Sequence, residues 1–421
     1  MLTESHDEEQ IIARVAALDI GKAELVCCVR VPAPDSARKR LQEVSTHSTM
    51  TGSLIGLANR LVELRVERVV MEATSDYWKP VFYLLEAHGL APWLVNARDV
   101  KHLPGRPKTD VLDAVWLCKV AERQMLRPSF VPPPAIRRLR DLTRYRIDLV
   151  GVRTAEKNRV EKLLEDAQIK LSVVVSDIFG VCGRDMLAAL VAGERNPTVL
   201  AQLARRTMRR KITVLEEAFT GYFTDHHAFL LAMMLARIDA LTAQIDTLTT
   251  RIGEAIAPYA AQVAQLDEIP GIGIAAAQDL LAEIGTGMSR FPTPGHLVSW
   301  AKFAPRARQS AGRSKAASTG KGNPWLGGTL GEAATSAART KTFLASRYKR
   351  IARRRGKQRA LVAVGNSILT IAWHLLSDPA AHFTDLGPDW HDRLAPLRRK
   401  RQLIAELERL SGKKVTLQDT V

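Results

Sequence analysis

The chain has 421 residues, of which 46% are hydrophobic, so its length and composition provide for two or three domains with their own cores. Its net charge of +17 favours polyanionic partners, with nucleic acid first among them. The most apolar stretch, 361–376, is interrupted by Asn366 and Ser367 and is short for a membrane span. The acidic start, with Glu4 and Asp7, is unlike a signal peptide. We therefore expect a cytoplasmic protein without a membrane partner.

The four cysteines are Cys27, Cys28, Cys118 and Cys182, and none of them belongs to a C-x-x-C pair or a metal-ligand pattern. We expect all four to be reduced and structural.

The first part of the chain has the pattern of an α/β domain. Apolar runs at 15–21 and 25–31 predict a strand hairpin, followed by a polar stretch that contains Pro32, Pro34 and Asp35. Further strands are predicted at 68–73 and 91–95, and helices at 53–64, 77–88 and 109–123. The proline cluster at 132–134 marks the expected end of this domain.

From residue 137 to about 256 the pattern becomes helical. Ile238, Ile245 and Ile252 recur at seven-residue intervals, which is typical of a long helix with an apolar seam. An antiparallel coiled coil or a dimer seam would account for this spacing, and so would an ordinary helical bundle. The opposite face is basic, and we expect Arg144 and Arg153 on it to bind nucleic acid.

A third region begins at residue 266 and extends to about 376. Its middle is rich in Gly, Ser and Lys, and its end is helical again. A charged tail follows, in which 398–401 is a run of Arg and Lys.

Four acids in the first region form the clearest chemical signal. Asp19 and Glu72 each end an apolar strand, while Asp110 and Asp113 are three residues apart on one helix face. Convergent carboxylates are the ligands that Mg²⁺ prefers, and an RNase H-like fold carries such acids on central strands and a late helix. Each acid also has an ordinary interpretation as a turn, capping or pairing residue.

A glycine-containing turn, 269–274, precedes a predicted helix at 275–284. Gly271 and Gly273 would leave backbone N–H groups free for a phosphate, as in helix-hairpin-helix modules that hold the DNA backbone. A turn between helices without a ligand explains the same residues.

The segment 303–324 places hydroxyl groups among cations. A serine that attacks phosphorus needs cationic neighbours around the phosphoryl oxygens. Composition does not choose among the hydroxyls, and a flexible phosphate-binding loop is the simpler interpretation. The hydroxyls are Ser310, Ser314, Ser318 and Thr319, and the cations are Arg306, Arg308, Arg313, Lys315 and Lys321.

Taken together, these blocks resemble the DEDD transposases of insertion-sequence family one-ten, which are bridge-RNA-guided recombinases. The resemblance covers roughly the first 375 residues. It rests on the order of 18–22 (LDIGK), 71–74 (MEAT), 108–114 (KTDVLDA), 269–273 (IPGIG), 303–305 (FAP), 309–312 (QSAG) and 322–326 (GNPWL).

The resemblance implies a multidomain α/β plus α protein. A RuvC-like, RNase H-like catalytic domain would span 1–134, a helical coiled-coil linker 135–260, and a mostly helical transposase domain 261–378, before the tail 379–421. Asp19, Glu72, Asp110 and Asp113 would coordinate Mg²⁺. By its place in the Gln-Ser-x-Gly block, Ser310 would be the nucleophile.

In this family the serine forms a covalent phosphoserine link to DNA, and a structured RNA from the element chooses the donor and target sites. The active site is thought to combine the acids of one subunit with the serine of another, which implies a homo-oligomer, a dimer or tetramer.

Two other functions fit parts of the pattern. A RuvC-like Holliday-junction nuclease would use water as the nucleophile, so the acids would be essential and Ser310 would be dispensable. A non-catalytic nucleic-acid-binding protein would need neither metal nor serine, but its binding would still depend strongly on salt.

Overall fold

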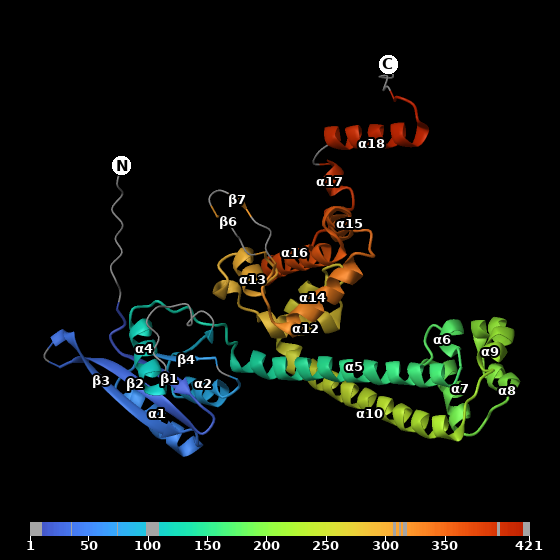
Figure 1. Ribbon diagram of the computed structural model, residues 1–421. Helices are drawn as coiled ribbons and strands as arrows, with labels where there is room; N and C mark the ends of the chain where they lie inside the picture. Colours follow the sequence, from blue (N-terminus) through green and yellow to red (C-terminus); the bar gives the residue numbers. More distant parts are fainter. Residues whose placement is uncertain are drawn as a thin grey trace. The chain divides into compact units, whose positions relative to one another are not determined.

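The computed structural model describes residues 11–34, 36–73, 75–97, 109–305, 309–310, 313–314, 318–393 and 396–415. The chain divides into two compact units, Met1–Pro132 and Pro133–Val421 (Figure 1).

Unit 1 contains a five-stranded mixed sheet with the order β3-β2-β1-β4-β5. The first three strands pair antiparallel as a meander, and β4 and β5 run parallel to β1. This topology is consistent with the expected RNase H-like domain. The strands are β1 (Val15–Ile20), β2 (Glu24–Ala33), β3 (Ser36–Ser48), β4 (Arg68–Glu72) and β5 (Pro92–Val95).

Helices cover both faces of this sheet, because successive side chains of a strand point to opposite sides. Ala16 and Leu18 of β1 pack in a core with α1 (Thr51–Glu63) and α2 (Trp78–Ala87). Val15 and Ala17 pack on the other face, which α4 (Asp110–Glu122) covers. The predicted strands and helices of this domain are confirmed within a few residues.

One strand was not predicted. The polar stretch after the hairpin contains β3, which pairs along its length with β2 alone. An edge strand has one neighbour and little buried surface, so it needs no apolar alternation that a sequence pattern would reveal.

Unit 2 begins with two long helices, α5 (Pro134–Asp166) and α10 (Asp225–Ile256), which run antiparallel. Leu149 of α5 packs against Leu241 and Ile245 of α10. At the far end, His227 Nε2 lies 3.2 Å from an Asp166 carboxylate oxygen. The seven-residue spacing therefore serves a pairing within the chain.

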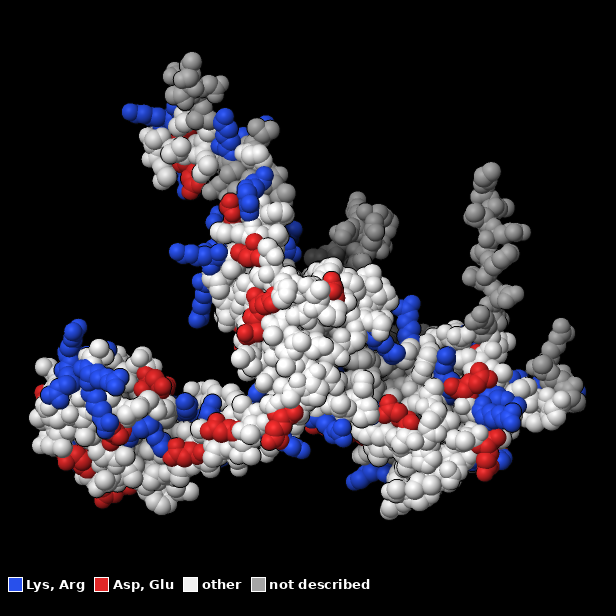
Figure 2. All heavy atoms as spheres, turned by 180° about the vertical axis from the view of Figure 1, so that it is seen from behind, with Lys and Arg blue, Asp and Glu red and all other residues white. Residues whose placement is uncertain are grey.

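A cap of short helices joins the far ends of α5 and α10 and was not predicted. It has its own hydrophobic core, in which Met186, Leu187 and Leu215 are fully buried. Figure 2 shows Lys and Arg side chains gathered at this tip of the arm. The cap consists of α6 (Leu171–Val174), α7 (Val181–Val191), α8 (Pro197–Gln202), η1 (Arg206–Lys211) and α9 (Ile212–Ala218).

In the C-terminal part of unit 2, α11, α13, α14 and α15 pack against α16, in which Val364, Ile368 and Leu369 are buried. Two short segments, η2 (Ala257–Tyr259) and η3 (Met288–Arg290), connect its helices. The helices are α11 (Ala260–Asp267), α12 (Ile274–Ile284), α13 (Pro294–Trp300), α14 (Pro324–Ala337), α15 (Phe343–Arg355), α16 (Lys357–Ser377), α17 (Trp390–Arg393) and α18 (Pro396–Ser411).

Two helical stretches, Asp225–Asp267 and Lys357–Ser377, are long and apolar enough to span a membrane by length and composition. The sequence expectation had found no such stretch. In the fold, apolar residues of both stretches pack against other helices, including Leu241 in the arm and Ile368 in α16. Core packing thus involves part of each stretch, with 28% and 44% of the respective apolar windows buried.

Adjacent residues of α1 provide a test of the core of unit 1. Leu61 is fully buried, whereas Val62 is 47% exposed. We expect Leu61→Ala to lower the free energy of unfolding by about 2–5 kcal/mol, because it leaves a cavity between helix and sheet. Val62→Ala is the matched control, with an expected change below about 0.5 kcal/mol in the same urea titration. Equal effects of the two substitutions would contradict this packing.

Candidate active site

Two of the predicted acids lie side by side at one edge of the sheet. The parallel pairing of β1 and β4 aligns Leu18 with Met71, so the next positions on the two strands are Asp19 and Glu72. Both residues are half-buried. By strand alternation both belong to the face that α4 covers, since Ala17 and Val70 pack there.

The direction of α4 brings its first turn towards the same edge. The Ile12 backbone N–H donates to Glu122 O at 3.0 Å, and the Cys118 thiol donates to Val15 O at 3.6 Å, so the helix ends near the start of β1. The eight residues from Cys118 back to Asp110 span about 12 Å of helix, and the four from Val15 to Asp19 span about 13 Å of strand. The helix start is therefore level with Asp19.

Thr109 caps this helix, because its hydroxyl accepts a hydrogen bond from the Leu112 backbone N–H at 3.4 Å. Asp110 is the first helical residue, and its side chain lies outside the described residues. Asp113 is half-buried in the first turn. Three elements thus bring four predicted acids to one edge of unit 1.

The side chains of these residues are carboxylates, which are oxygen donors. Oxygen donors from a few carboxylates are what Mg²⁺ takes in proteins. Asp19, Glu72 and Asp113 each already take part in a polar interaction within the chain. Among the side chains that the structure describes, no three His, Cys, Asp or Glu residues are grouped closely enough to hold a metal ion.

The cysteines of unit 1 belong to the hydrophobic cores on the two faces of the sheet. Cys27, Cys28 and Cys118 are buried, and all four cysteines of the chain are free thiols. Burial raises the pKa of the Cys27 thiol well above its usual range, so it stays protonated.

The predicted nucleophile lies in a short hairpin of unit 2. Gln309–Ser310 (β6) pairs antiparallel with Arg313–Ser314 (β7), which sets Ser310 opposite Arg313. The side chains of these four residues lie outside the described part of the chain, as do Arg306, Arg308 and Lys315 entirely. Lys321, the last predicted cation of this segment, is exposed.

The two ends of the serine segment are held together. A Cβ atom added at Gly322 would lie 2.6 Å from the Ala301 carbonyl oxygen, so only glycine permits this approach. The Asn366 side-chain amide donates to Phe303 O at 3.2 Å from α16. The two described ends of the segment, around Phe303 and Gly322, therefore meet at one place and form its base.

Asn323 ends this segment and starts α14. Its side-chain oxygen accepts hydrogen bonds from the Trp325 and Leu326 backbone N–H groups at 3.0 and 3.3 Å. Its side-chain nitrogen donates to the Glu283 carboxylate of α12. One side chain therefore caps a helix and joins it to a buried acid.

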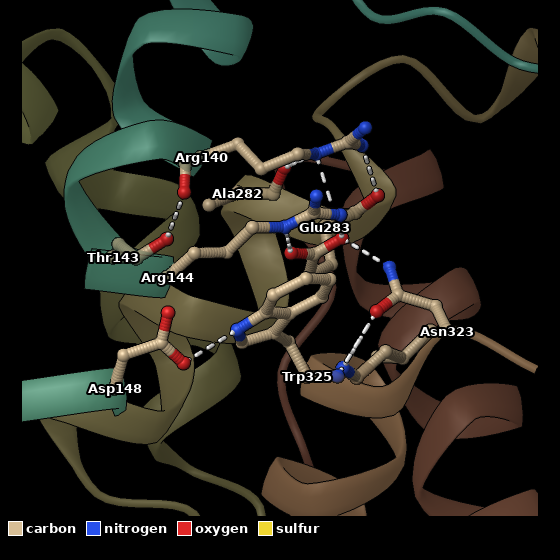
Figure 3. Close-up of polar contacts among 9 residues, drawn as sticks. Arg140, Thr143, Arg144, Asp148, Ala282, Glu283, Asn323 and Trp325 are labelled. Atoms are coloured by element: carbon tan, nitrogen blue, oxygen red, sulfur yellow. Dashed lines mark hydrogen bonds and ion pairs between the residues drawn. The ribbon is translucent and has the colours of Figure 1, made fainter. Parts of the chain in front are cut away.

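Glu283 is the centre of a network across α5, α12 and α14 (Figure 3). Its side chain is 2% exposed and pairs with the Arg144 guanidinium through two hydrogen bonds of 2.6 and 2.9 Å. Arg140 Nε lies 3.4 Å from the same carboxylate and donates to the Ala282 carbonyl at 3.1 Å.

Arg144 also stacks on Trp325, with its guanidinium carbon 4.2 Å from the ring centroid. The Trp325 indole N–H donates to Asp148 of α5 at 3.2 Å. The sequence placed Arg144 on a nucleic-acid-binding face, but in the fold its guanidinium is occupied by Glu283 and Trp325. Arg153 donates to the Thr242 hydroxyl at 3.3 Å and links α5 to α10.

The predicted phosphate-binding turn packs closely against α14. Gly271 has a φ of +91°, and a Cβ there would lie 2.3 Å from Ala333 O. Gly273 caps α12 and has open space around it.

Beside this turn is a groove of about 750 Å³. Asp148, Asp279 and Glu332 line it, without any Lys or Arg among the described lining residues, which weighs against a bound phosphate. Burial raises the pKa of Asp279, although Arg146 pairs with it at 2.7 Å.

The comparisons with known families agree with these two sites. Residues 16–169 match a transposase model, DEDD transposase IS110, and this segment contains all four predicted acids. Residues 263–349 match the model Transposase IS116/IS110/IS902 family, and this segment contains Ser310 and Asn323. No curated protein matches the chain.

The fold, the acidic sheet edge and both matches define the class of this protein as a transposase. The two matched segments, which follow one another on one chain and together span more than half of it, support an IS110-family transposase. The distal cap of the arm lies between the two matched segments.

The Glu283 network predicts that replacing this one carboxylate with an amide strongly lowers the free energy of unfolding. Glu283→Gln removes the charge that balances two arginines, and we expect a loss of about 3 kcal/mol in the free energy of unfolding. Asp148→Asn is the control, because Asp148 is exposed and accepts only the indole hydrogen bond in this network. A loss below about 1 kcal/mol for Glu283→Gln in urea denaturation would show that the network is dispensable.

The two glycines of the turn form a second matched pair. Gly271→Ala should destabilise the protein by about 2 kcal/mol or more, because of its positive φ and the contact with α14. Gly273→Ala, with a φ of −114° and open space, should leave the thermal unfolding midpoint unchanged or raise it slightly. If the order of the two variants were reversed, the packing role of Gly271 would be wrong.

Proposed function

We propose that this transposase cuts and rejoins the DNA of an insertion sequence by magnesium-dependent attack of Ser310 on phosphorus. The observation that carries the proposal is the alignment of Asp19 with Glu72 on adjacent parallel strands, with the start of α4 level with them. The matched transposase families support the DNA substrate.

Asp19, Glu72, Asp110 and Asp113 would hold Mg²⁺. When bound, the metal supplies positive charge that stabilises the attacking and leaving oxygens of a phosphodiester. The half-buried positions of Asp19, Glu72 and Asp113 support this role, because a partly dehydrated carboxylate interacts more strongly with a cation.

Ser310 Oγ would form a new bond to phosphorus while the bond from phosphorus to a deoxyribose oxygen breaks. The serine proton is transferred away, and the leaving oxygen gains a proton. A free DNA hydroxyl then attacks the phosphoserine and releases Ser310, so no energy source is consumed. Arg306, Arg308, Arg313, Lys315 and Lys321 would neutralise the phosphoryl oxygens.

The closed base of the serine segment supports a defined position for Ser310. Catalytic groups must be held within fractions of an ångström, and rigid elements do this better than free loops. Gly322 against Ala301, and Asn323 against Glu283, provide such an attachment.

We further propose a homo-oligomer, dimer or tetramer, in which the acids of one subunit act with the serine of another. Phe229 and Met233 of α10 support it, because they are 66% and 59% exposed on consecutive turns. A guide RNA is the proposed second nucleic-acid partner, in keeping with the net charge of +17. The cytoplasm is the proposed location.

Covalent capture tests the serine assignment. The protein, produced together with the non-coding DNA that flanks its gene, is incubated with Mg²⁺ and labelled element-junction DNA, then denatured. We expect a denaturant-stable protein–DNA adduct that is lost in Ser310→Ala and in Asp19→Ala. Ser314→Ala, on the paired strand of the same hairpin, should retain the adduct.

The contrary outcome is equally specific. Cleaved DNA without an adduct, undiminished in Ser310→Ala, would exclude the serine nucleophile and favour a junction nuclease that uses water.

A further inference from the structure

One long stretch of unit 2 without an acid contains a dense run of cations. No Asp or Glu occurs between Glu332 and Asp378, and ten Lys or Arg residues lie at 339–359. Most of them belong to α15 and the start of α16. A run of this kind on a solvated helix is common, so the contacts of its side chains decide what it does.

These cations are not paired within the chain. Among the described residues, no ion pair involves a Lys or Arg of 339–359. Elsewhere in unit 2, Arg144, Arg146 and Arg184 each have an acidic partner. The surface therefore carries a positive charge that nothing in the described chain neutralises. Its exposed members on α15 and the start of α16 are Lys349, Arg350, Arg353, Arg354, Arg355, Lys357 and Arg359, and Arg339 and Lys341 before α15 are exposed as well.

Arg347 shows that this surface is not merely solvated. It is half-buried, and its Nε is buried without a hydrogen-bond partner in the described structure. Burial, and then the neighbouring Arg350, lower the pKa of its guanidinium. A dehydrated cation beside another cation is unfavourable unless an anion completes it. Such an arrangement is typical of a site that awaits a phosphate.

The helix is rigidly connected to the serine segment. α15 ends at Gly356, whose φ of +86° allows α16 to begin at the next residue. About 12 Å farther along α16, Gly365 abuts the Phe303 ring, where a Cβ would lie 2.6 Å from a ring carbon. Asn366 donates to the Phe303 carbonyl. The same helix thus starts at the basic surface and holds the base of the Ser310 segment.

We propose that the exposed face of α15, with the start of α16, binds the sugar–phosphate backbone of duplex DNA next to Ser310. This inference rests on the proposed function for the identity of the DNA and adds the surface that positions it. Phosphate contacts fix the register of a duplex without reading its sequence. Figure 2 shows Lys and Arg side chains projecting to solvent from an edge of this part of the molecule.

The test uses the salt dependence of binding, which counts phosphate contacts. The full-length protein with Ser310→Ala, without Mg²⁺, is titrated into labelled duplex DNA of random sequence at several salt concentrations, and binding is followed by fluorescence anisotropy. The variant is Arg350→Ala/Arg353→Ala/Arg354→Ala. Three lost contacts should reduce the slope of log affinity against log salt by about 2.7, or about 0.9 for each contact.

Two controls of matched charge make the result specific. Arg206→Ala/Arg209→Ala/Arg210→Ala removes three exposed arginines from η1 at the tip of the arm and should leave most of the slope. Arg350→Lys/Arg353→Lys/Arg354→Lys keeps the charge on α15 and should retain the slope. Circular dichroism and thermal unfolding verify that each variant is folded.

Arg347→Met distinguishes an arginine that binds DNA from one that only packs within the protein. Replacing an unpaired half-buried cation with an apolar side chain of similar length should raise the thermal unfolding midpoint of the free protein, while weakening DNA binding. A lower midpoint with unchanged DNA affinity would assign Arg347 to packing alone and contradict the proposal.

The proposed DNA-binding surface would be wrong if the slope of log affinity against log salt were unchanged in the α15 triple variant. It would also be wrong if the slope fell equally in the variant at the tip of the arm. A fall with structured RNA but not with duplex DNA would overturn DNA as its partner. These outcomes are independent of the chemistry. If no covalent adduct forms but the slope falls as expected, the serine mechanism fails and the DNA surface stands. If the adduct forms and the slope is unchanged, the serine mechanism stands and the DNA surface fails.

Discussion

The Glu283 carboxylate is buried, and the packing of α5, α12 and α14 depends on the groups that neutralise its charge. Two arginines of α5 and the Asn323 amide contact it, and the Trp325 ring stacks on one of these arginines, Arg144 (Figure 3). A buried charge without partners would cost several kcal/mol, so α5, α12 and α14 are held in one relative position. The arm and the base of the serine segment consequently belong to one rigid framework.

Around that framework the basic groups separate into two kinds. Arg140, Arg144 and Arg146 are used internally, each against an acid or amide of α12. The arginines of α15 have no such partner in the described chain, and all of them except the half-buried Arg347 are exposed. A net charge of +17 therefore does not describe a uniformly basic surface, and one dense group of unpaired cations lies on α15 and the start of α16.

Much of the sheet could be predicted from the sequence, because β1 and β4 are buried strands with Asp19 and Glu72 at or next to their last residue. Their apolar runs identified the strands, but only the parallel register shows that the two acids are neighbours. β3 was missed because an edge strand with polar faces has no distinguishing pattern. The distal cap was missed because its helices are short and gain their stability from packing rather than from local propensity.

The roles of Arg144 and Glu283 could not be predicted for a different reason. Arg144 is 139 residues from Glu283 in the chain, and a basic helix face has the same composition whether it meets solvent, phosphate or a buried acid. The Asn323-Pro324 pair was a detectable signal, since Asn before Pro is typical of a capped helix start. The run of Arg and Lys at 347–359 can also be seen in the sequence, but only its lack of acidic partners in the described structure indicates a binding surface.

The most direct test of the central claim is to locate the covalent bond. Adduct formed with Mg²⁺ and junction DNA would be digested with nuclease and protease, and the peptides analysed by mass spectrometry. The account predicts a nucleotide remnant on Ser310 alone. A remnant on Ser314, Ser318 or Thr319, or an unmodified serine segment beside fully cleaved DNA, would contradict it.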